Sequence, residues 1–581
     1  MSKNLNNIWS LLTPKQKKFF YFFILLSFIS SFLEVLSLGT IIPVLGSILD
    51  PSMFQKLFFY DKLINLLGNI DKNLFTIYSI IFLVIVFLLK NLFLSFLTWF
   101  HLYFINTIRI SLSKKLYNLY LNLPFTFHLK NNSTILFRNI DYEILNVSQT
   151  VFKIITLIVE ILVFFSIITF LFYYNFKVTL ISLIFIVLIG SIFYFVMRSK
   201  LIDWGKKRQF HSGKFLQHLF HGLNSIKDVK MLDRQNSFLN LFYKNQELAV
   251  RYARLETVTT SLTRYLLEFI SILGLGIFIV LMTLMNKNNT EIIITISLLG
   301  AAIYRLAPSA NKIITSLSSL QFLSISVTTI KNEFERIKKE NFGQLINLKK
   351  HRFLHDLKFK NLNYKYPGTS KYILKDAQFA LKKNSIVGLY GKSGSGKTTL
   401  INIICNLLLP EKGDLILDGK KFDLNKDKCR LDIGYISQST TLIDDSVEKN
   451  IAFGIPEQEI DKEMLKRCVK ISRVDNFLDA LPNGLKTKVG ERGTRLSGGQ
   501  QQRIGIARAL YNNPEILIID EGTNSLDNKT ELEILNDISS LKNFLTIIII
   551  SHDMNIIKSY SDYCFELNDN KIIEIKLNEK N

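Results

Sequence analysis

The chain has 581 residues, which exceeds the size of one compact domain and indicates at least two. Hydrophobic residues make up 48% of it, with 46 Phe, and long apolar runs fill the part up to about residue 315. The remainder has the composition of a soluble α/β protein. A formal net charge of +23 is compatible with binding to nucleic acid, to an anionic membrane surface or to an anionic substrate. Because the basic residues flank the apolar runs, we favour the membrane and expect no nucleic-acid partner.

Six apolar stretches are long enough to cross a membrane, since a spanning helix needs roughly 20 mostly apolar residues. They cover residues 19–46, 74–100, 147–173, 178–197, 265–285 and 292–313. The third and fourth stretches are joined by a short turn, and so are the fifth and sixth. The connections after the second and fourth stretches are long and basic, which predicts a cytoplasmic location. The first stretch is itself long enough to span, and we expect no cleaved signal.

This pattern predicts four regions in a multi-domain membrane protein. They are an N-terminal cytosolic elbow segment (1–18), a six-span all-α transmembrane domain (19–315), a helical linker (316–356) and a soluble nucleotide-binding domain (357–581). Within the external segment 47–73, residues 53–67 carry an apolar stripe with charges between. Two interpretations stay open for that segment: a helix packed on its own bundle, or an amphipathic helix at the lipid interface.

The cysteines all lie in the soluble part: Cys405, Cys429, Cys468 and Cys564. Their spacing is too wide for a close metal-ligand pair, and a cytosolic domain keeps thiols reduced. We therefore interpret them as packing residues.

The first functional motif of the soluble domain is a phosphate-binding loop. The apolar strand 385–390 leads into a glycine-rich stretch, and the apolar helix 400–409 follows. Glycines let backbone N–H groups approach phosphates, and the helix N-terminus adds partial positive charge. Lys397 is expected at the β- and γ-phosphates, and the Thr398 hydroxyl at Mg²⁺. The expected nucleotide-binding residues here are Gly391, Lys392, Ser393, Gly394, Ser395, Gly396, Lys397, Thr398 and Thr399.

Two carboxylates follow a second buried strand, 515–519. Asp520 is placed to hold Mg²⁺, and Glu521 is placed to polarise the attacking water in phosphoryl transfer. An acidic pair at a strand end can also be a helix cap, but downstream of a phosphate loop the catalytic interpretation is favoured.

The segment Leu496-Ser497-Gly498-Gly499-Gln500 resembles the signature motif of ATP-binding cassette (ABC) proteins. Other landmarks of that family follow the same order: the adenine-stacking aromatic at Tyr366, the Q-loop at Gln438, the D-loop at 524–527 and the switch histidine at His552. The stretch 489–493 matches the loop that precedes the signature in exporters. The resemblance covers residues 357–575.

The resemblance implies a homodimeric type IV ABC exporter half that binds ATP and Mg²⁺ and hydrolyses ATP. Ser497, Gly499 and Gln500 of one subunit would close over the nucleotide held by Lys397 of the other. The catalytic residues carried over are Glu521, His552, Gln438 and Lys397, and the metal ligands are Thr398, Gln438 and Asp520. The D-loop and the residues after His552 depart from the family pattern, but neither departure touches the lysine, the base or the histidine, so two active and equivalent sites are expected.

The cargo has to be predicted from polar residues inside the spans. Lys90 interrupts the second span, while Arg305 and Lys312 lie on one face of the sixth, with Pro308 between them. These side chains either snorkel to the inner interface or face a central cavity. In a homodimer the cavity arrangement would form a ring of about six cations suited to a phosphate or pyrophosphate.

Residues 302–316 resemble the sixth span of bacterial lipid-linked oligosaccharide flippases of protein N-glycosylation, and Lys90 and Glu34 also fit that type. Lys stands for Arg at two positions, which keeps the charge and loses the bidentate geometry. The resemblance implies that an undecaprenyl-pyrophosphate-linked oligosaccharide moves from the inner to the outer leaflet of the bacterial inner membrane.

The alternatives are a lipid A or multidrug-type exporter, and a non-transporting channel or regulator of the same family. The intramembrane cations favour the oligosaccharide lipid over the lipid A or multidrug type, and the presence of Glu521 disfavours the regulator. A peptide exporter is disfavoured because the chain shows no Cys/His peptidase before the spans.

Overall fold

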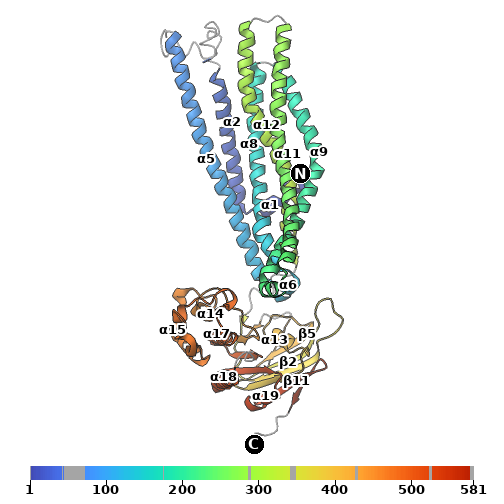
Figure 1. Ribbon diagram of the computed structural model, residues 1–581, viewed down its shortest axis with the longest axis vertical. Coiled ribbons are helices and arrows are strands. Elements are labelled where there is room, and N and C mark those ends of the chain that lie inside the picture. Colours follow the sequence, from blue (N-terminus) through green and yellow to red (C-terminus); the bar gives the residue numbers. More distant parts are fainter. Residues whose placement is uncertain are drawn as a thin grey trace. The chain divides into compact units, whose positions relative to one another are not determined.

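The structure is a computed structural model that describes residues 2–41, 44, 72–174, 176–284, 289–339, 349–424, 429–521 and 527–575 (Figure 1). Most of the external segment 47–73 and most of the D-loop lie outside this description. The chain divides into two compact units. The first comprises Met1–Leu121 and Asn131–Glu340, and the second comprises Asn122–Lys130 and Asn341–Asn581.

The described secondary-structure elements of the first unit are all helices. Its helices are α1 (Ser2–Leu11), α2 (Pro14–Gly39), α5 (Lys72–Leu121), α7 (Ser133–Arg138), a π-helical turn (Asn139–Glu143), α8 (Ile144–Tyr174), α9 (Phe176–Asn224), α10 (Ile226–Met231), α11 (Gln235–Leu284) and α12 (Asn289–Lys339). The short helix α6 (Phe125–Lys130) belongs to the second unit.

Several of these helices are far longer than a membrane is thick. The 50 residues of α5 extend about 75 Å at 1.5 Å per residue, against roughly 30 Å of hydrocarbon core. The predicted cytoplasmic connections 102–146 and 198–257 are therefore largely continuations of spanning helices. The sixth span and most of the predicted helical linker likewise form one helix, α12.

Five helices among the described residues meet the length and hydropathy of a membrane span. They contain Pro14–Gly39, Thr76–Leu121, Ser133–Tyr173, Gln235–Ile277 and Leu306–Lys339. The predicted fourth span falls within α9, where many side chains lie outside the description. Helix α2 begins where the sequence specifies it, because Thr13 and Gln16 form a reciprocal capping box ahead of Pro14.

The close approach of α9 and α12 depends on Gly205. A Cβ atom on this residue would lie 2.3 Å from the backbone carbonyl oxygen of Phe322. Gly205→Ala should therefore force the two helices apart and lower the free energy of unfolding by about 1–3 kcal/mol. The measurement is thermal unfolding in detergent, with Gly276→Ala on α11 as the matched control, since a Cβ there meets nothing within 4 Å. Equal unfolding temperatures for both variants would contradict the packing argument.

The described residues of the second unit form three sheets. Their strands are β1 (Lys349–Lys350), β2 (Asp356–Tyr364), β3 (Leu374–Lys382), β4 (Ile386–Tyr390), β5 (Lys412–Leu417), β6 (Lys420–Asp423), β7 (Cys429–Arg430), β8 (Ile433–Ile436), β9 (Ile516–Asp520), β10 (Thr546–Ser551), β11 (Tyr563–Asn568) and β12 (Lys571–Ile575). The main sheet has the order β12-β11-β4-β10-β9-β8 and is parallel from β11 to β8. A four-stranded antiparallel sheet has the order β3-β2-β5-β6, and β1 pairs with β7.

The second unit also contains helices. They include α13 (Lys397–Ile404), α14 (Val447–Ile451), α15 (Lys462–Ile471), α16 (Asp475–Leu478), α17 (Gly498–Tyr511), α18 (Asn528–Ser540) and α19 (Met554–Tyr560). Of these, α17 packs against β8, and α19 against β4 and β10. The carboxyl ends of β4, β9 and β10 lie side by side in the parallel sheet, which is where ligands bind in this kind of sheet.

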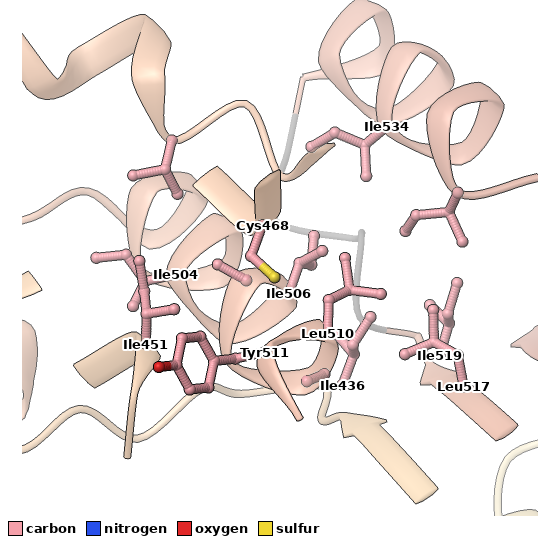
Figure 2. Close-up of a cluster of buried hydrophobic side chains, with 14 of the residues drawn as sticks. Ile436, Ile451, Cys468, Ile504, Ile506, Leu510, Tyr511, Leu517, Ile519 and Ile534 are labelled. Atoms are coloured by element: carbon pink, nitrogen blue, oxygen red, sulfur yellow. The ribbon is translucent and has the colours of Figure 1, made fainter. Parts of the chain in front are cut away.

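The central strands of the main sheet, β4, β10 and β9, are buried on both faces. Along β9, Ile516 and Ile518 join one hydrophobic cluster, while Leu517 and Ile519 join the other, as the alternation of side chains along a strand requires. Figure 2 shows strand and α17 residues of the second of these clusters together: Ile436, Leu517, Ile519, Ile504, Ile506 and Leu510. This double burial makes the strand ends a rigid support for the polar residues that follow them.

Candidate nucleotide site and intramembrane charges

The phosphate-binding loop lies between β4 and α13, as predicted. Gly394 and Gly396 have φ angles of 78° and 107°, which only glycine adopts readily. A Cβ atom at Gly391 would come within 2.8 Å of the Leu567 carbonyl oxygen. Lys397 is buried in the first turn of α13, and its Nζ donates to the carbonyl oxygens of Gly391 (2.6 Å) and Lys392 (3.1 Å). The loop is thus closed around the lysine that the sequence singled out.

Tyr366 lies next to this loop. Its hydroxyl is 3.2 Å from Oγ1 of Thr399 in α13, and its ring packs edge-on against Tyr364 at 5.2 Å. The neighbouring Thr398 is exposed at the start of α13. The aromatic residue expected to stack on adenine is therefore held beside the helix that begins at Lys397.

Asp520 ends β9, where it is buried. The Tyr435 hydroxyl at the end of β8 donates a 2.8 Å hydrogen bond to Oδ2 of Asp520. Burial raises the pKa of Asp520, against the effect of that hydrogen bond, and burial together with Asp520 raises the pKa of Tyr435. A carboxylate desolvated in this way gains from a nearby divalent cation.

Gln438, Glu521 and His552 come together at the ends of neighbouring strands. Nε2 of Gln438 donates to Oε2 of Glu521 at 2.9 Å, and Nδ1 of His552 lies 3.6 Å from Oε1 of the same carboxylate. Glu521 has a φ of 48°, an uncommon angle for a residue with a side chain, and its N–H donates to the Ile550 carbonyl oxygen. Backbone strain of this kind persists where the surroundings hold a side chain in place, and it is concentrated at functional sites.

The signature motif forms the start of α17. Ser497 is the N-cap, and it exchanges hydrogen bonds with Gln500 in a capping box. Ser497 and Gly498 are exposed, so the positive end of α17 faces outward. Such an end can receive an anion. In the D-loop, the described Asp527 caps α18 through a 3.0 Å bond from the Thr530 N–H.

The residues present fit Mg²⁺, which prefers oxygen ligands. The Thr398 hydroxyl, the Gln438 side-chain oxygen and the Asp520 carboxylate are the groups that would hold it. Bound there, the ion would neutralise charge on the phosphates.

The cysteines fit the packing role expected for them. Cys429, Cys468 and Cys564 are buried, and burial raises the pKa of Cys405 to about 12 and that of Cys468 to about 11. Thiols with such values carry almost no reactive thiolate at neutral pH.

In the first unit, which contains the candidate membrane spans, Lys90 forms a buried ion pair. Its Nζ lies 3.5 Å from Oε2 of Glu34 on α2 and 3.4 Å from Oγ of Ser37, and it sits over the Phe87 ring. The side chains of Lys90 and Glu34 are only 11% and 3% exposed. In this chain Lys90 does not face an open cavity. Its desolvated ammonium is buried and is stabilised by a carboxylate.

Lys312 also has a carboxylate partner, but its side chain is more exposed than that of Lys90. Its Nζ lies 2.6 Å from Oε1 of Glu160 on α8, and Oγ of Ser309 donates to Oε2 of Glu160 at 2.6 Å. Glu160 is 5% exposed, whereas the Lys312 side chain is 52% exposed. The Arg305 side chain lies outside the described residues. Lys90 and Lys312 thus each have a carboxylate partner, and the ring of about six cations in a homodimer stays a prediction.

Two residues at these sites were not singled out from the sequence. Tyr435 gave no signal, since a tyrosine in a strand is ordinary. Glu160 did carry a signal, because an ionisable residue inside a span is uncommon and costly.

Comparison with known proteins identifies both parts of the chain. The family model described as ABC transporter transmembrane region matches residues 19–307, and the model described as ABC transporter matches residues 374–524. The chain therefore belongs to the ABC transporters, and the predicted fold class is confirmed. More particularly, it is an exporter half-transporter, a multi-pass membrane protein in which ATP hydrolysis is coupled to transport.

Relatives and a solved structure agree with this assignment. The chain is 26% identical to an ATP-dependent lipid A-core flippase of Ralstonia nicotianae, over 81% of this chain and 79% of that protein. It is 28% identical to a protein of the same name from Pseudomonas fluorescens, over 79% and 76%. A bacterial Atm1-family ABC exporter with ATP bound superposes with a TM-score of 0.75 at 20% identity, covering 94% of each chain, which supports the fold.

Proposed function

We propose that the protein is an ATP-driven flippase for a lipid with an anionic, phosphate-bearing headgroup, which it moves from the inner to the outer leaflet of a bacterial inner membrane. The observation that carries the proposal is the half-exposed Lys312 ammonium within the sixth spanning helix. A cation at membrane depth is costly unless it serves a ligand or a partner. The names of the relatives point the same way, since lipid A is a phosphorylated glycolipid.

Lipid A is the favoured cargo, and the undecaprenyl-pyrophosphate-linked oligosaccharide is the second candidate. The first is supported by relatives that match about four fifths of the chain, membrane part included. The second is supported by the 302–316 segment with its two cations. A multidrug function has weaker support, because the relative named multidrug resistance protein 1, from Entamoeba histolytica, matches only 38% of this chain.

The nucleotide site supplies the driving force in this proposal. Lys397 and the loop residues 391–399 would hold the phosphates, Tyr366 the adenine, and Thr398, Gln438 and Asp520 the Mg²⁺ ion. Glu521 would polarise the attacking water, with Gln438 and His552 orienting it through the observed contacts. A non-transporting regulator is disfavoured by this complete set.

A homodimer belongs to the proposal, because one chain carries one transmembrane region and one cassette. Ser497, Gly499 and Gln500 at the exposed start of α17 would then face the nucleotide bound by the other subunit, whose cassette would lie in the cytosol like this one. The positive helix end supplies the electrostatic reason for this placement.

The test is a flipping assay in proteoliposomes that compares lipid A, a polyprenyl-pyrophosphate glycan and a cationic drug. We expect lipid A to move, and Lys312→Met to lower the lipid moved per ATP hydrolysed by about tenfold or more, the value of a charge-assisted hydrogen bond. Lys338→Met, on an exposed part of the same helix, is the control. Movement of the drug alone, or unchanged coupling in Lys312→Met, would contradict the proposal.

A further inference from the structure

Lys90 and Lys312, the two lysines predicted to meet the cargo, differ in how they are paired. At Lys90 both partners are buried, so the pair is closed to any lipid. At Lys312 the carboxylate is buried while the ammonium is half exposed. A headgroup can therefore approach Lys312 from one side while Glu160 holds it from the other.

Glu160 is well fixed for such a role. It lies about 21 Å along α8 from the external end at Tyr174, inside the cytoplasmic half of the hydrocarbon core. Oε2 accepts the Ser309 hydroxyl at 2.6 Å, and Oε1 accepts the Lys312 ammonium at 2.6 Å. Ser309 and Lys312 are three residues apart, on the same face of α12, so one carboxylate bridges two successive turns of the helix.

The opposite charges of Lys312 and Glu160 together determine how strongly a phosphate binds here. An ammonium has three donors, and the bond to Glu160 uses one of them, which leaves donors for a phosphate oxygen on the exposed side. The buried carboxylate then lies on the far side of the same ammonium and repels the phosphate. In a medium of low polarity this repulsion is screened far less than in water.

We propose that Glu160 is a specificity-determining residue that acts through Lys312: it holds the ammonium toward the headgroup and weakens phosphate binding enough for release. This inference rests on the proposed function and deepens it. A transporter needs such weakening, because a lipid that is bound too tightly is not released at the other leaflet. Glu160 thus sets the balance between capture and release at the cationic site.

The experiment measures lipid binding and lipid-stimulated ATPase of the full-length protein in phosphatidylcholine nanodiscs. The probes are lipid A and the same lipid with its phosphates removed. Glu160→Gln keeps the shape and the hydrogen-bonding oxygen but removes the charge. We expect the lipid A concentration for half-maximal stimulation to fall about tenfold, the maximal transport rate in proteoliposomes to fall, and the dephosphorylated lipid to respond as in the wild type.

Three controls separate this role from a structural one. Glu160→Asp, which keeps the charge, should restore wild-type affinity. Glu34→Gln changes the carboxylate that pairs with Lys90 and should leave lipid A affinity unchanged. In a Lys312→Met background, Glu160→Gln should have no further effect, because its influence passes through the ammonium.

The inference is overturned if Glu160→Gln leaves lipid A affinity unchanged, or shifts both probes equally. The failure of the proposed function looks different: in that case the wild type would not distinguish lipid A from its dephosphorylated form. If Glu160→Gln yields too little folded protein, Glu160→Asp and the Lys312→Met double variants still decide the outcome by the same two probes.

Discussion

Glu521→Gln should bind ATP and hydrolyse it at least about a hundredfold more slowly than the wild type. The carboxylate is held at the strand ends by Gln438 at 2.9 Å and lies 3.6 Å from His552, where it can orient and activate a water. Removing a positioned base typically costs 10²–10⁴-fold in rate. The amide keeps the hydrogen bond to Gln438 within reach, so binding should survive while turnover fails.

The measurement combines steady-state ATP hydrolysis with nucleotide retention after gel filtration. Glu463→Gln is a matched control, since this carboxylate is 91% exposed on α15 and lies outside the nucleotide site. Hydrolysis above about a tenth of the wild-type rate in Glu521→Gln would remove Glu521 from the role of base.

Lys90→Met should strongly destabilise the first unit. It would leave the Glu34 carboxylate, only 3% exposed, without the ammonium now 3.5 Å away. Breaking a buried ion pair from one side typically costs about 3–5 kcal/mol, because a buried charge loses its countercharge. Thermal unfolding in detergent and the yield of monodisperse protein are the measurements.

The double variant Lys90→Met with Glu34→Gln tests the cause. With both charges removed, the pair becomes neutral and most of the lost stability should return. A single variant as stable as the wild type would show that the ion pair contributes nothing. Failure of the double variant to recover would instead indicate that the Lys90 side chain matters for packing over the Phe87 ring.

The cassette was readable from the sequence because its chemistry is carried by contiguous motifs. The loop 391–398 has its strand before it and its helix after it, and the structure forms β4 and α13 there. Asp520 and Glu521 follow a run of apolar residues that becomes the buried strand β9. Local geometry constrains residues at such spacings, so pattern and structure agree.

Contacts between residues far apart in the sequence could not be predicted in this way. Gln438 and Glu521 are 83 residues apart, and their contact follows from the order of strands in the sheet rather than from either motif. The helices also continue beyond the predicted spans, because their polar cytoplasmic extensions lack the apolar pattern that marks a span.

The sequence by itself determined the class of this protein. Long apolar runs require spanning helices, and a phosphate loop with its downstream carboxylates requires a nucleotide-hydrolysing cassette, because both depend on residues close together in the chain. Only the tertiary structure decided how the intramembrane charges are paired. Glu160 and Lys312 are 152 residues apart, and their pairing depends on how α8 and α12 pack. In a medium that stabilises no isolated charge, that packing turns the predicted cations into one closed pair and one half-open pair.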